Sequence, residues 1–384
     1  MSDPAPRPDD AARAARRTVA RVVALTLVTI SLVTGLTVAV LYRHFDSNLN
    51  VVDITPQLGH DRPAAPPVTA QKGPVNILVM GSDNRDAPGD RIDNLTGIGQ
   101  RSDTTILLHL SADRQHAYGV SIPRDSIVDR ADCLNDSGKV ISPPATGVMW
   151  NDAFNIGGPG CTVRQFEQLT GVRVDHYVVV DFNGFKSMVD AIGGVEVCLP
   201  HAVNDPIGHI TLPAGTHKFS GDQALNYVRE RHSLGNGSDI GRMKRQQAFI
   251  ASMAHQAISA DTLANPIHLA RFIDAATKSL TLDPDIGSIS KLVGLAYQFR
   301  HIGLDHIQFV TTPWMPDPSD PNRVVWKPEA QQVWDAIKND DVLSKAMLSG
   351  SLNAKHIPGV TRHPKNGSQE QAAAADNLAN GLCA

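Results

Sequence analysis

Arginine and aspartate residues gather at the ends of short apolar runs, and together they suit the chemistry of phosphate. An arginine guanidinium keeps its charge and can donate two parallel hydrogen bonds to phosphate oxygens. Carboxylates beside such arginines supply the oxygen ligands that a divalent cation prefers. Three runs are flanked in this way: Val75–Met80 is followed by Asp83 and Arg85, Thr104–Leu110 is preceded by Arg101 and Asp103, and Ala117–Ile122 is followed by Arg124 and Asp125.

Two later segments with helical spacing add further donors. Arg229 and Arg231 close the first segment, and they converge only if the helix ends there, as the Ser/Gly/Asn-rich stretch 233–237 suggests. Arg242 and Gln246 are four residues apart in the second segment and therefore share one helical face. Any single one of these residues could form an ordinary surface salt bridge. The whole set at element ends favours a site for a pyrophosphate and a divalent cation.

The elements that must position these residues alternate between strands and helices. Short apolar, β-branched runs predict strands at Val75–Met80, Thr104–Leu110, Ala117–Ile122, His176–Val180, Val195–Cys198 and His306–Val310. Helical spacing covers Val163–Thr170, Phe182–Ile192, Gln223–Arg231, Ile240–Ile258, Ile267–Leu280 and Ile286–Phe299. The alternation predicts an α/β sandwich around a mostly buried sheet, in which ligands lie beside strand ends.

Composition and missing motifs exclude several classes of function. The chain has 384 residues, of which 42% are hydrophobic and 19% charged, so it can build a large core. Its formal net charge of −4 speaks against a general nucleic-acid binder. The sequence contains no P-loop, no H-E-x-x-H zinc motif and no G-x-S-x-G nucleophile elbow.

A membrane anchor is predicted near the amino terminus. Val22–Tyr42 carries no charged residue, and its length matches the roughly 20 residues that a helix needs to cross a bilayer. A cleaved signal peptide has a shorter apolar region and a small-residue cleavage site, which is not seen after Tyr42. Arginines before the run, with only Arg43 close behind it, place the amino terminus in the cytoplasm and the rest outside.

The cysteines agree with this orientation, because all four lie on the predicted outer side. An even number in an oxidising compartment permits two disulfides. Cys133 and Cys161 bracket a loop-like stretch and are the favoured pair, which leaves Cys198 and Cys383.

The domain limits follow from these features. Residues 1–21 are expected in the cytoplasm, 22–42 in the membrane and 43–73 in an extracellular proline-rich linker. A catalytic domain is expected over 74–342, followed by a loosely ordered tail over 343–384 that lacks periodicity.

An ordered series of long motifs resembles the LytR-CpsA-Psr family of cell-wall glycopolymer ligases, and more closely its high-GC Gram-positive members. The resemblance covers about residues 74–340. Its motifs are NILVMGSDNR (76–85), RSDTTILLHL (101–110), VSIPRDS (120–126), the stretch 151–185 from NDAFNIGG to DFNGF, VDAIGGVEVCL (189–199), ALNYVRERH (224–232) and GRMKRQQAF (241–249). Many members carry Lys-Ile-Asn where this chain has Met149-Trp150-Asn151, so the lysine is missing here and Asn151 remains.

The resemblance implies a three-layer α/β/α sandwich with a central mixed sheet. It also implies a phosphotransferase that moves a glycopolymer from a polyprenyl-pyrophosphate carrier to the 6-hydroxyl of N-acetylmuramic acid in peptidoglycan. Teichoic acid, arabinogalactan or capsule donors would use the same site. Matching by motif, Asp83 and Asp103 would hold Mg²⁺ or Mn²⁺, and the pyrophosphate would be bound by Arg101, Arg124, Arg229, Arg231, Arg242 and Gln246, with Arg85 and Asn151 nearby.

Chemistry leaves two points open at this stage. A carboxylate must take the proton of the acceptor hydroxyl, and Asp103 and Asp125 are both candidates. Two other functions also remain: a hydrolase that uses water with the same arginines, and a membrane-bound regulator. The regulator would need a cytoplasmic output domain, and residues 1–21 are too short to fold as one.

Overall fold

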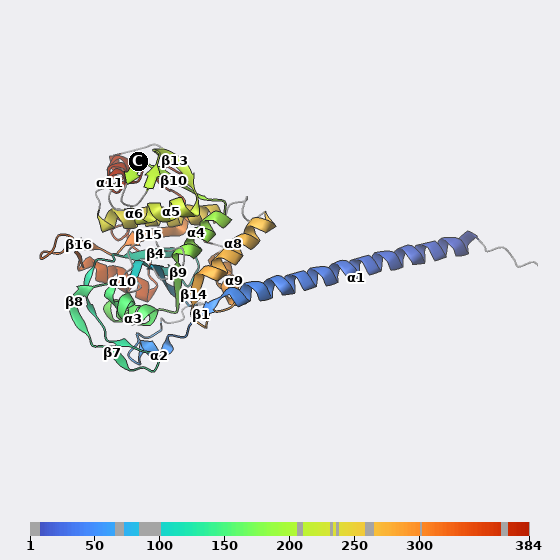
Figure 1. The fold of residues 1–384 in the computed structure, drawn as a ribbon, viewed down its shortest axis with the longest axis horizontal. Coiled ribbons are helices and arrows are strands. Elements are labelled where there is room, and N and C mark those ends of the chain that lie inside the picture. Colours follow the sequence, from blue (N-terminus) through green and yellow to red (C-terminus); the bar gives the residue numbers. More distant parts are fainter. Residues whose placement is uncertain are drawn as a thin grey trace, which may run out of the picture. The chain divides into compact units, whose positions relative to one another are not determined.

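The computed structural model describes residues 8–65, 73–83, 101–205, 210–230, 233–235, 238–257, 265–299, 302–361 and 368–383 (Figure 1). The chain divides into two compact units, Met1–Asn48 and Leu49–Ala384. The first contains one helix, α1 (Pro8–Asn48). Within α1, Arg16–Asn48 is long and apolar enough to span a bilayer, with a mean hydropathy of 2.2 in its most apolar window. This helix fits the single-pass membrane anchor expected from the sequence.

An eight-stranded mixed sheet forms the centre of the second unit. Its strand order is β1-β14-β9-β2-β3-β4-β15-β18. The strands are β1 (Asn50–Val51), β2 (Val75–Asp83), β3 (Arg101–Leu110), β4 (Ala117–Ile122), β9 (His176–Asp181), β14 (Leu280–Leu282), β15 (Ile307–Thr311) and β18 (Leu352–Asn353). The pairs β2–β9 and β4–β15 are parallel, whereas β3 runs antiparallel to both β2 and β4.

Helices cover both faces of this sheet, which confirms the three-layer α/β/α sandwich (Figure 1). On one face, α2 (Thr55–Leu58), α3 (Asp152–Thr170) and α10 (Glu329–Asn339) bury Phe166 and Trp334 against Leu107 and Val120. On the other face lie α4 (Phe182–Ala191), α5 (Gly221–Arg229) and α6 (Asp239–Ala257). The alternation of side chains along a strand explains this division, because Val310 packs in the first layer and its neighbour Phe309 packs against α6.

The remaining elements are short. The two-stranded pairs are β5 (Ile127–Arg130) with β8 (Ala145–Met149), β6 (Cys133–Leu134) with β7 (Val140–Ser142), β10 (Val195–Leu199) with β13 (Gly215–Phe219), β11 (Val203–Asp205) with β12 (Ile210–Leu212), and β16 (Trp314–Pro316) with β17 (Val324–Trp326). The other helices are α8 (Pro266–Ser279), α9 (Ile289–Phe299), the 3-10 helix η1 (Leu304–His306) and α11 (Ser368–Ala379).

The prediction that residues 43–73 form a linker is wrong for residues 50–62, which pack against the domain. β1 pairs with β14, and Ile54 and Leu58 are buried in the core. Arg62 forms an ion pair with Glu167 at 2.6 Å. An isolated Ile or Leu in a proline-rich stretch gives no periodic signal, so the sequence hid this attachment.

The expected loose tail from 343 is also wrong for its described residues. Leu343, Leu352, Ile357 and Leu382 are buried, and β18 extends the central sheet by pairing with β15. Cys383 is bonded to Cys198. Short pairing and a covalent link hold this segment, and neither produces hydrophobic periodicity.

Two disulfides are present, as expected. Cys133 and Cys161 are joined with their Cα atoms 4.9 Å apart, and Cys198 and Cys383 with theirs 5.8 Å apart. Cys161 lies in α3, which is kinked where Gly158 adopts a positive φ of 59°. Glycine suits this position because it has no Cβ to clash. The kink also explains why the sequence predicted only the second half of α3.

Candidate active site

Strand register brings the predicted strand ends to one edge of the central sheet. Asp83 pairs with Arg101 across β2 and β3, and Ser82 pairs with Asp181 at the end of β9. Thr105, near the start of β3, pairs with Ile122 at the end of β4. The last residues of β2, β4 and β9 and the first residues of β3 therefore share this edge.

Arg124 and Asp125 lie in a tight turn directly after β4. The Ser126 amide donates to the Pro123 carbonyl at 3.1 Å, which closes the turn. The Arg124 Nε donates to Asp125 Oδ1 at 3.2 Å, and the two side chains are 17% and 11% exposed. The turn thus holds a guanidinium and a carboxylate side by side at the sheet edge.

Arg229 ends α5 and reaches the residue that follows β9. The cap residue Glu230 leaves the helical conformation, so the helix ends at Arg229, as the predicted convergence requires. The Arg229 guanidinium carbon lies 4.9 Å from the centre of the Phe182 ring. This cation–π contact places Arg229 at the end of β9.

Helix α6 is fixed to the same edge by its glutamines. Gln247 Nε2 donates to Ser121 Oγ at 2.9 Å and to Thr311 Oγ1 at 3.1 Å, at the ends of β4 and β15. Gln246 Nε2 donates to the Val228 carbonyl at 3.1 Å, beside Arg229. The structure therefore brings α5 and α6 together with the end of β4.

Arg242 is more enclosed than its sequence position indicated. It is only 1% exposed, and its guanidinium Nε donates to Asp239 Oδ1 at 3.1 Å. Burial with a carboxylate partner orients an arginine within a site at the cost of desolvation.

Arg245 has a role that sequence reasoning missed. Its guanidinium donates to the carbonyls of Glu230, Leu234 and Asn380, and burial lowers the pKa of Arg245. Glu230 and Leu234 lie on either side of Arg231 in the sequence. Arg245 thus holds the chain at Glu230 and at Leu234.

Asn151 stands at the junction of β8 and α3. It is 5% exposed, and its side-chain oxygen Oδ1 is buried with no hydrogen-bond partner among the described residues. The preceding Trp150 fills the core and donates from Nε1 to Thr105 Oγ1 at 3.1 Å, close to the start of β3. An unpaired buried acceptor at the sheet edge is suited to a ligand donor such as a hydroxyl.

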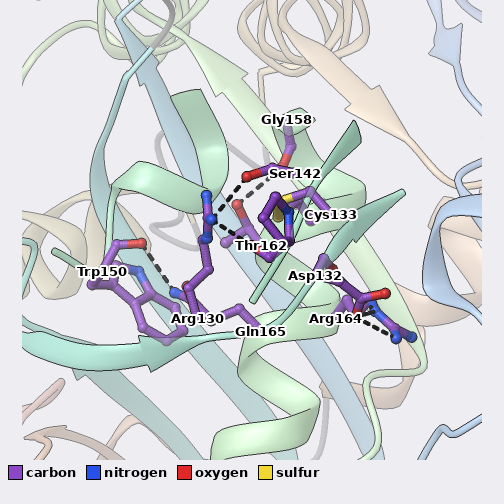
Figure 2. The surroundings of a disulfide bond; sticks show 11 residues. Arg130, Asp132, Cys133, Ser142, Trp150, Gly158, Thr162, Arg164 and Gln165 are labelled. Atoms are coloured by element: carbon purple, nitrogen blue, oxygen red, sulfur yellow. Dashed lines mark hydrogen bonds and ion pairs between the residues drawn. A yellow bond between two sulfur atoms is a disulfide. The ribbon is translucent and has the colours of Figure 1, made fainter. Parts of the chain in front are cut away.

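The Cys133–Cys161 disulfide supports this junction (Figure 2). It packs in a buried cluster with Ala153, two residues after Asn151. Gln165 Nε2, on the same helix as Cys161, donates to the Trp150 carbonyl at 3.0 Å. The disulfide therefore stiffens α3 at the end that carries Asn151.

Five of the predicted side chains lie outside the described part of the chain. Arg85 and Arg231 fall in undescribed segments, and only the backbone of Asp83, Arg101 and Asp103 is described. Among the side chains that the structure describes, no group of three or more His, Cys, Asp or Glu residues could hold a metal ion. The backbone register nevertheless places Asp83 and Asp103 on adjacent strands, and two carboxylates are a suitable donor set for Mg²⁺ or Mn²⁺.

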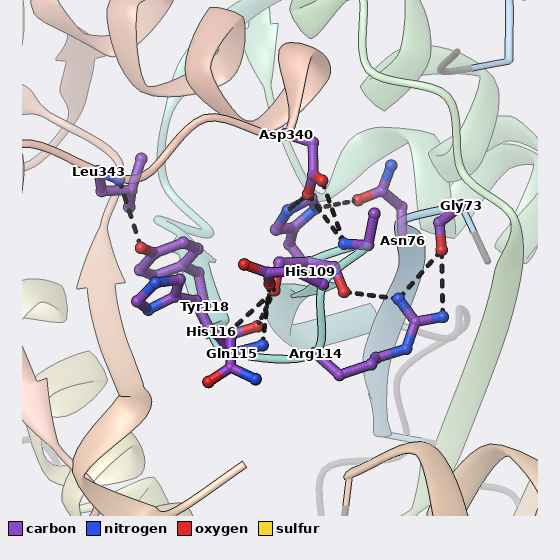
Figure 3. Close-up of polar contacts among 12 residues, drawn as sticks. Gly73, Asn76, His109, Arg114, Gln115, His116, Tyr118, Asp340 and Leu343 are labelled. Carbon is purple, nitrogen blue, oxygen red and sulfur yellow. Dashed lines mark hydrogen bonds and ion pairs between the residues drawn. The ribbon is translucent and has the colours of Figure 1, made fainter. Parts of the chain in front are cut away.

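A separate cavity of about 280 Å³ lies at the opposite edge of the sheet (Figure 3). His109 Nδ1 contacts Asn76 Oδ1 at 2.8 Å, and its Nε2 contacts Asp340 Oδ1 at 3.0 Å. Asp340 also accepts from the Ala112 amide, so it joins α10 to the end of β3. These groups are occupied in holding the sheet to α10, and the predicted site residues are not among those that line the cavity.

The comparisons identify the family. The LytR_cpsA_psr family matches residues 41–340, and the chain therefore belongs to it. The cell wall biosynthesis protein LcpA of Corynebacterium glutamicum is 32% identical over 268 residues, which cover 64% of this chain and 51% of that protein.

Two further relatives agree. The polyisoprenyl-teichoic acid–peptidoglycan teichoic acid transferase TagU of Oceanobacillus iheyensis is 29% identical over 223 residues, 58% of this chain and 63% of that protein. The solved LytR-Csp2A-Psr enzyme from Actinomyces oris shares the fold, with a TM-score of 0.55, 22% identity, and coverage of 76% of this chain and 96% of that one. The match thus spans about half the length of LcpA and under two thirds of TagU.

Proposed function

We propose that this protein is a phosphotransferase that moves a glycopolymer from a polyprenyl-pyrophosphate carrier to the 6-hydroxyl of N-acetylmuramic acid in peptidoglycan. The observation that carries the proposal is that Arg124 after β4 and Arg229 at the end of α5 lie at one end of the sheet, where Gln246 and Gln247 also fix α6, the helix that carries Arg242. Several guanidiniums at one edge match the charge of a diphosphate. The chain's relative LcpA is named a cell wall biosynthesis protein, and TagU a teichoic acid transferase.

The reaction breaks the phosphoanhydride bond of the donor and forms a phosphodiester with the acceptor. The acceptor hydroxyl oxygen attacks the phosphorus next to the first sugar, the bond from that phosphorus to the bridging oxygen breaks, and polyprenyl phosphate leaves with the electron pair. The arginines stabilise the charge that develops on the phosphoryl oxygens and the leaving phosphate. Asp83 and Asp103 would hold Mg²⁺ or Mn²⁺, which would supply further neutralisation of the diphosphate when bound.

The polyprenyl chain of the donor needs an apolar surface, and helix α9 would offer one. None of the α9 side chains is fully buried, and Val293 and Tyr297 are 59% and 57% exposed. Such apolar surface would accommodate a polyprenyl chain better than water does. Helix α4, by contrast, buries Met188 and Val189 in the core.

The location follows from the anchor. The α1 helix fits a single-pass membrane protein, and the arginines before it would keep the amino terminus in the cytoplasm and the domain outside. Both the lipid-linked donor and peptidoglycan would then be on the domain's side of the membrane.

Transfer to peptidoglycan distinguishes this proposal from its alternatives. Full-length protein in detergent would be incubated with a radiolabelled lipid-linked donor, peptidoglycan and Mg²⁺. Label that becomes attached to peptidoglycan supports the proposal. Label released as free sugar phosphate would indicate the hydrolase, and an unchanged donor would favour the regulator.

A further inference from the structure

A further arginine, Arg323, lies beside the turn that contains Arg124 and Asp125. Asp125 Oδ1 is 3.2 Å from Arg124 Nε and 3.4 Å from Arg323 Nη1. One carboxylate oxygen is therefore shared by two guanidiniums. Arg323 Nε also lies 3.7 Å from Asp320 Oδ2, whose side chain is 45% exposed. The Arg323 guanidinium has five N–H donors, more than its ion pairs engage.

The hairpin that carries Arg323 is firmly attached to the turn. The Val324 amide donates to the Asp125 carbonyl at 3.3 Å, and Ser126 forms an isolated parallel bridge with Val324. Trp326 Nε1 donates to Ser126 Oγ at 3.0 Å. The backbone position of Arg323 beside Asp125 is thus set by the fold.

Two tryptophans extend this attachment to the candidate site. The Trp326 ring lies 6.1 Å from that of Trp150, and the Trp150 amide donates to the Ser126 carbonyl at 2.8 Å. Trp150 directly precedes Asn151. The β16–β17 hairpin, which projects beyond β8 and α10 in Figure 1, is therefore connected to the β4 turn and to the β8–α3 junction together.

The side chains of Arg323 and Asp125 differ in solvent exposure. The Arg323 side chain is 33% exposed, whereas that of Asp125 is 11% exposed. Asp125 Oδ1 contacts both guanidiniums, so this carboxylate is placed to hold Arg124 and Arg323 together. A guanidinium that is one-third exposed can bind an anion from solution.

We propose that Arg323 is an additional anion-binding residue of the phosphate site, and that Asp125 is a positioning residue that holds Arg124 and Arg323 in place. This inference rests on the proposed function and adds the β16–β17 hairpin to the site. The ligand it would take is the diphosphate of the lipid-linked donor. The assignment leaves Asp103 as the candidate for the general base.

The first test compares arginine and lysine variants in the transfer assay. R323A should lower kcat/KM for the lipid-linked donor by about 10- to 100-fold with an unchanged melting temperature, and R323K should recover it only in part because lysine lacks the planar fork. K327A is the matched control: Lys327 is an exposed cation on the same hairpin, and its loss should leave transfer unchanged. If R323A is unstable, R323K keeps a cation beside Asp125 and its transfer rate decides the question.

The second test separates positioning from proton transfer. D125N should reduce the rate but keep the shape of its pH profile, since Asp125 does not take the proton. If D125N instead abolishes the acid limb of the profile, Asp125 is the base and the positioning role is overturned.

R124A makes failure of this inference distinguishable from failure of the proposed function. Full transfer by R323A and R323K while R124A is inactive would overturn the role of Arg323 and leave the proposed function standing. Full transfer by R124A as well would refute the phosphate site itself, and both proposals with it.

Discussion

Replacing Arg124 with alanine separates catalysis from folding, because we expect a small loss of stability and a large loss of transfer activity. Arg124 pairs with Asp125 at 3.2 Å, and its loss would normally leave a nearly buried carboxylate unpaired. Arg323 contacts the same carboxylate oxygen at 3.4 Å, so Asp125 keeps one cationic partner in the variant. The folded state therefore tolerates the change.

The expected magnitudes differ enough to be measured apart. A partly exposed ion pair contributes about 1 kcal/mol or less. For a domain of 200 residues or more, that corresponds to a fall in melting temperature of roughly 2–3 °C. An arginine that stabilises phosphoryl charge contributes more in the transition state, and a loss of two to four decades in transfer corresponds to about 2.7–5.4 kcal/mol at 1.36 kcal/mol per decade.

The assay follows label from a lipid-linked donor into peptidoglycan, with the melting temperature of each variant measured in the same buffer. R124K should restore part of the activity, because it keeps the charge and loses the bidentate geometry. A variant that unfolds and loses activity in proportion would show that Arg124 is a structural ion-pair residue. A variant that folds and transfers at the wild-type rate would refute the assignment of Arg124 to the phosphate site.

Three further predictions concern the fold and its setting. Replacing Cys133 and Cys161 with serine should lower the free energy of unfolding by about 3–4 kcal/mol, because the bond closes a loop between residues 28 apart, and chemical denaturation would measure it; an unchanged midpoint would mean that the bond constrains nothing. Burial alone would lower the pKa of His176, but its hydrogen bond to Asp283 and the nearby carboxylates raise it, so the stabilising charge is complete below the unfolded value of about 6.5 and is lost as pH rises through the folded pKa. The melting temperature of wild type should therefore fall as pH rises across this range, whereas that of His176→Asn should change less. Parallel dependences on pH would contradict the assignment. A reporter at the carboxyl terminus should be active only outside the cytoplasmic membrane, and cytoplasmic activity would reverse the proposed orientation.

Sequence alone determined the features that depend on local pattern. An uncharged run as long as a bilayer is thick indicates a membrane helix without any partner, and α1 contains it. The apolar runs from Val75 and Ala117 are β2 and β4, because β-branched runs bounded by turns form strands in most contexts. Arg124 and Asp125 were recognised because they directly follow such a run.

Only the tertiary structure decided which distant segments complete the site. Arg323 precedes the apolar residues of β17 much as Arg101 opens β3, so a weak signal existed, but no local pattern shows that this hairpin binds the turn after β4. The sequence likewise gave no sign that Arg245 holds both sides of the Arg231 segment, or that the residues after Leu343 are packed. These contacts join residues far apart in the chain through backbone hydrogen bonds, a disulfide and ring packing. Such interactions impose no periodicity on either partner, and they become visible only when the sheet has brought the partners together.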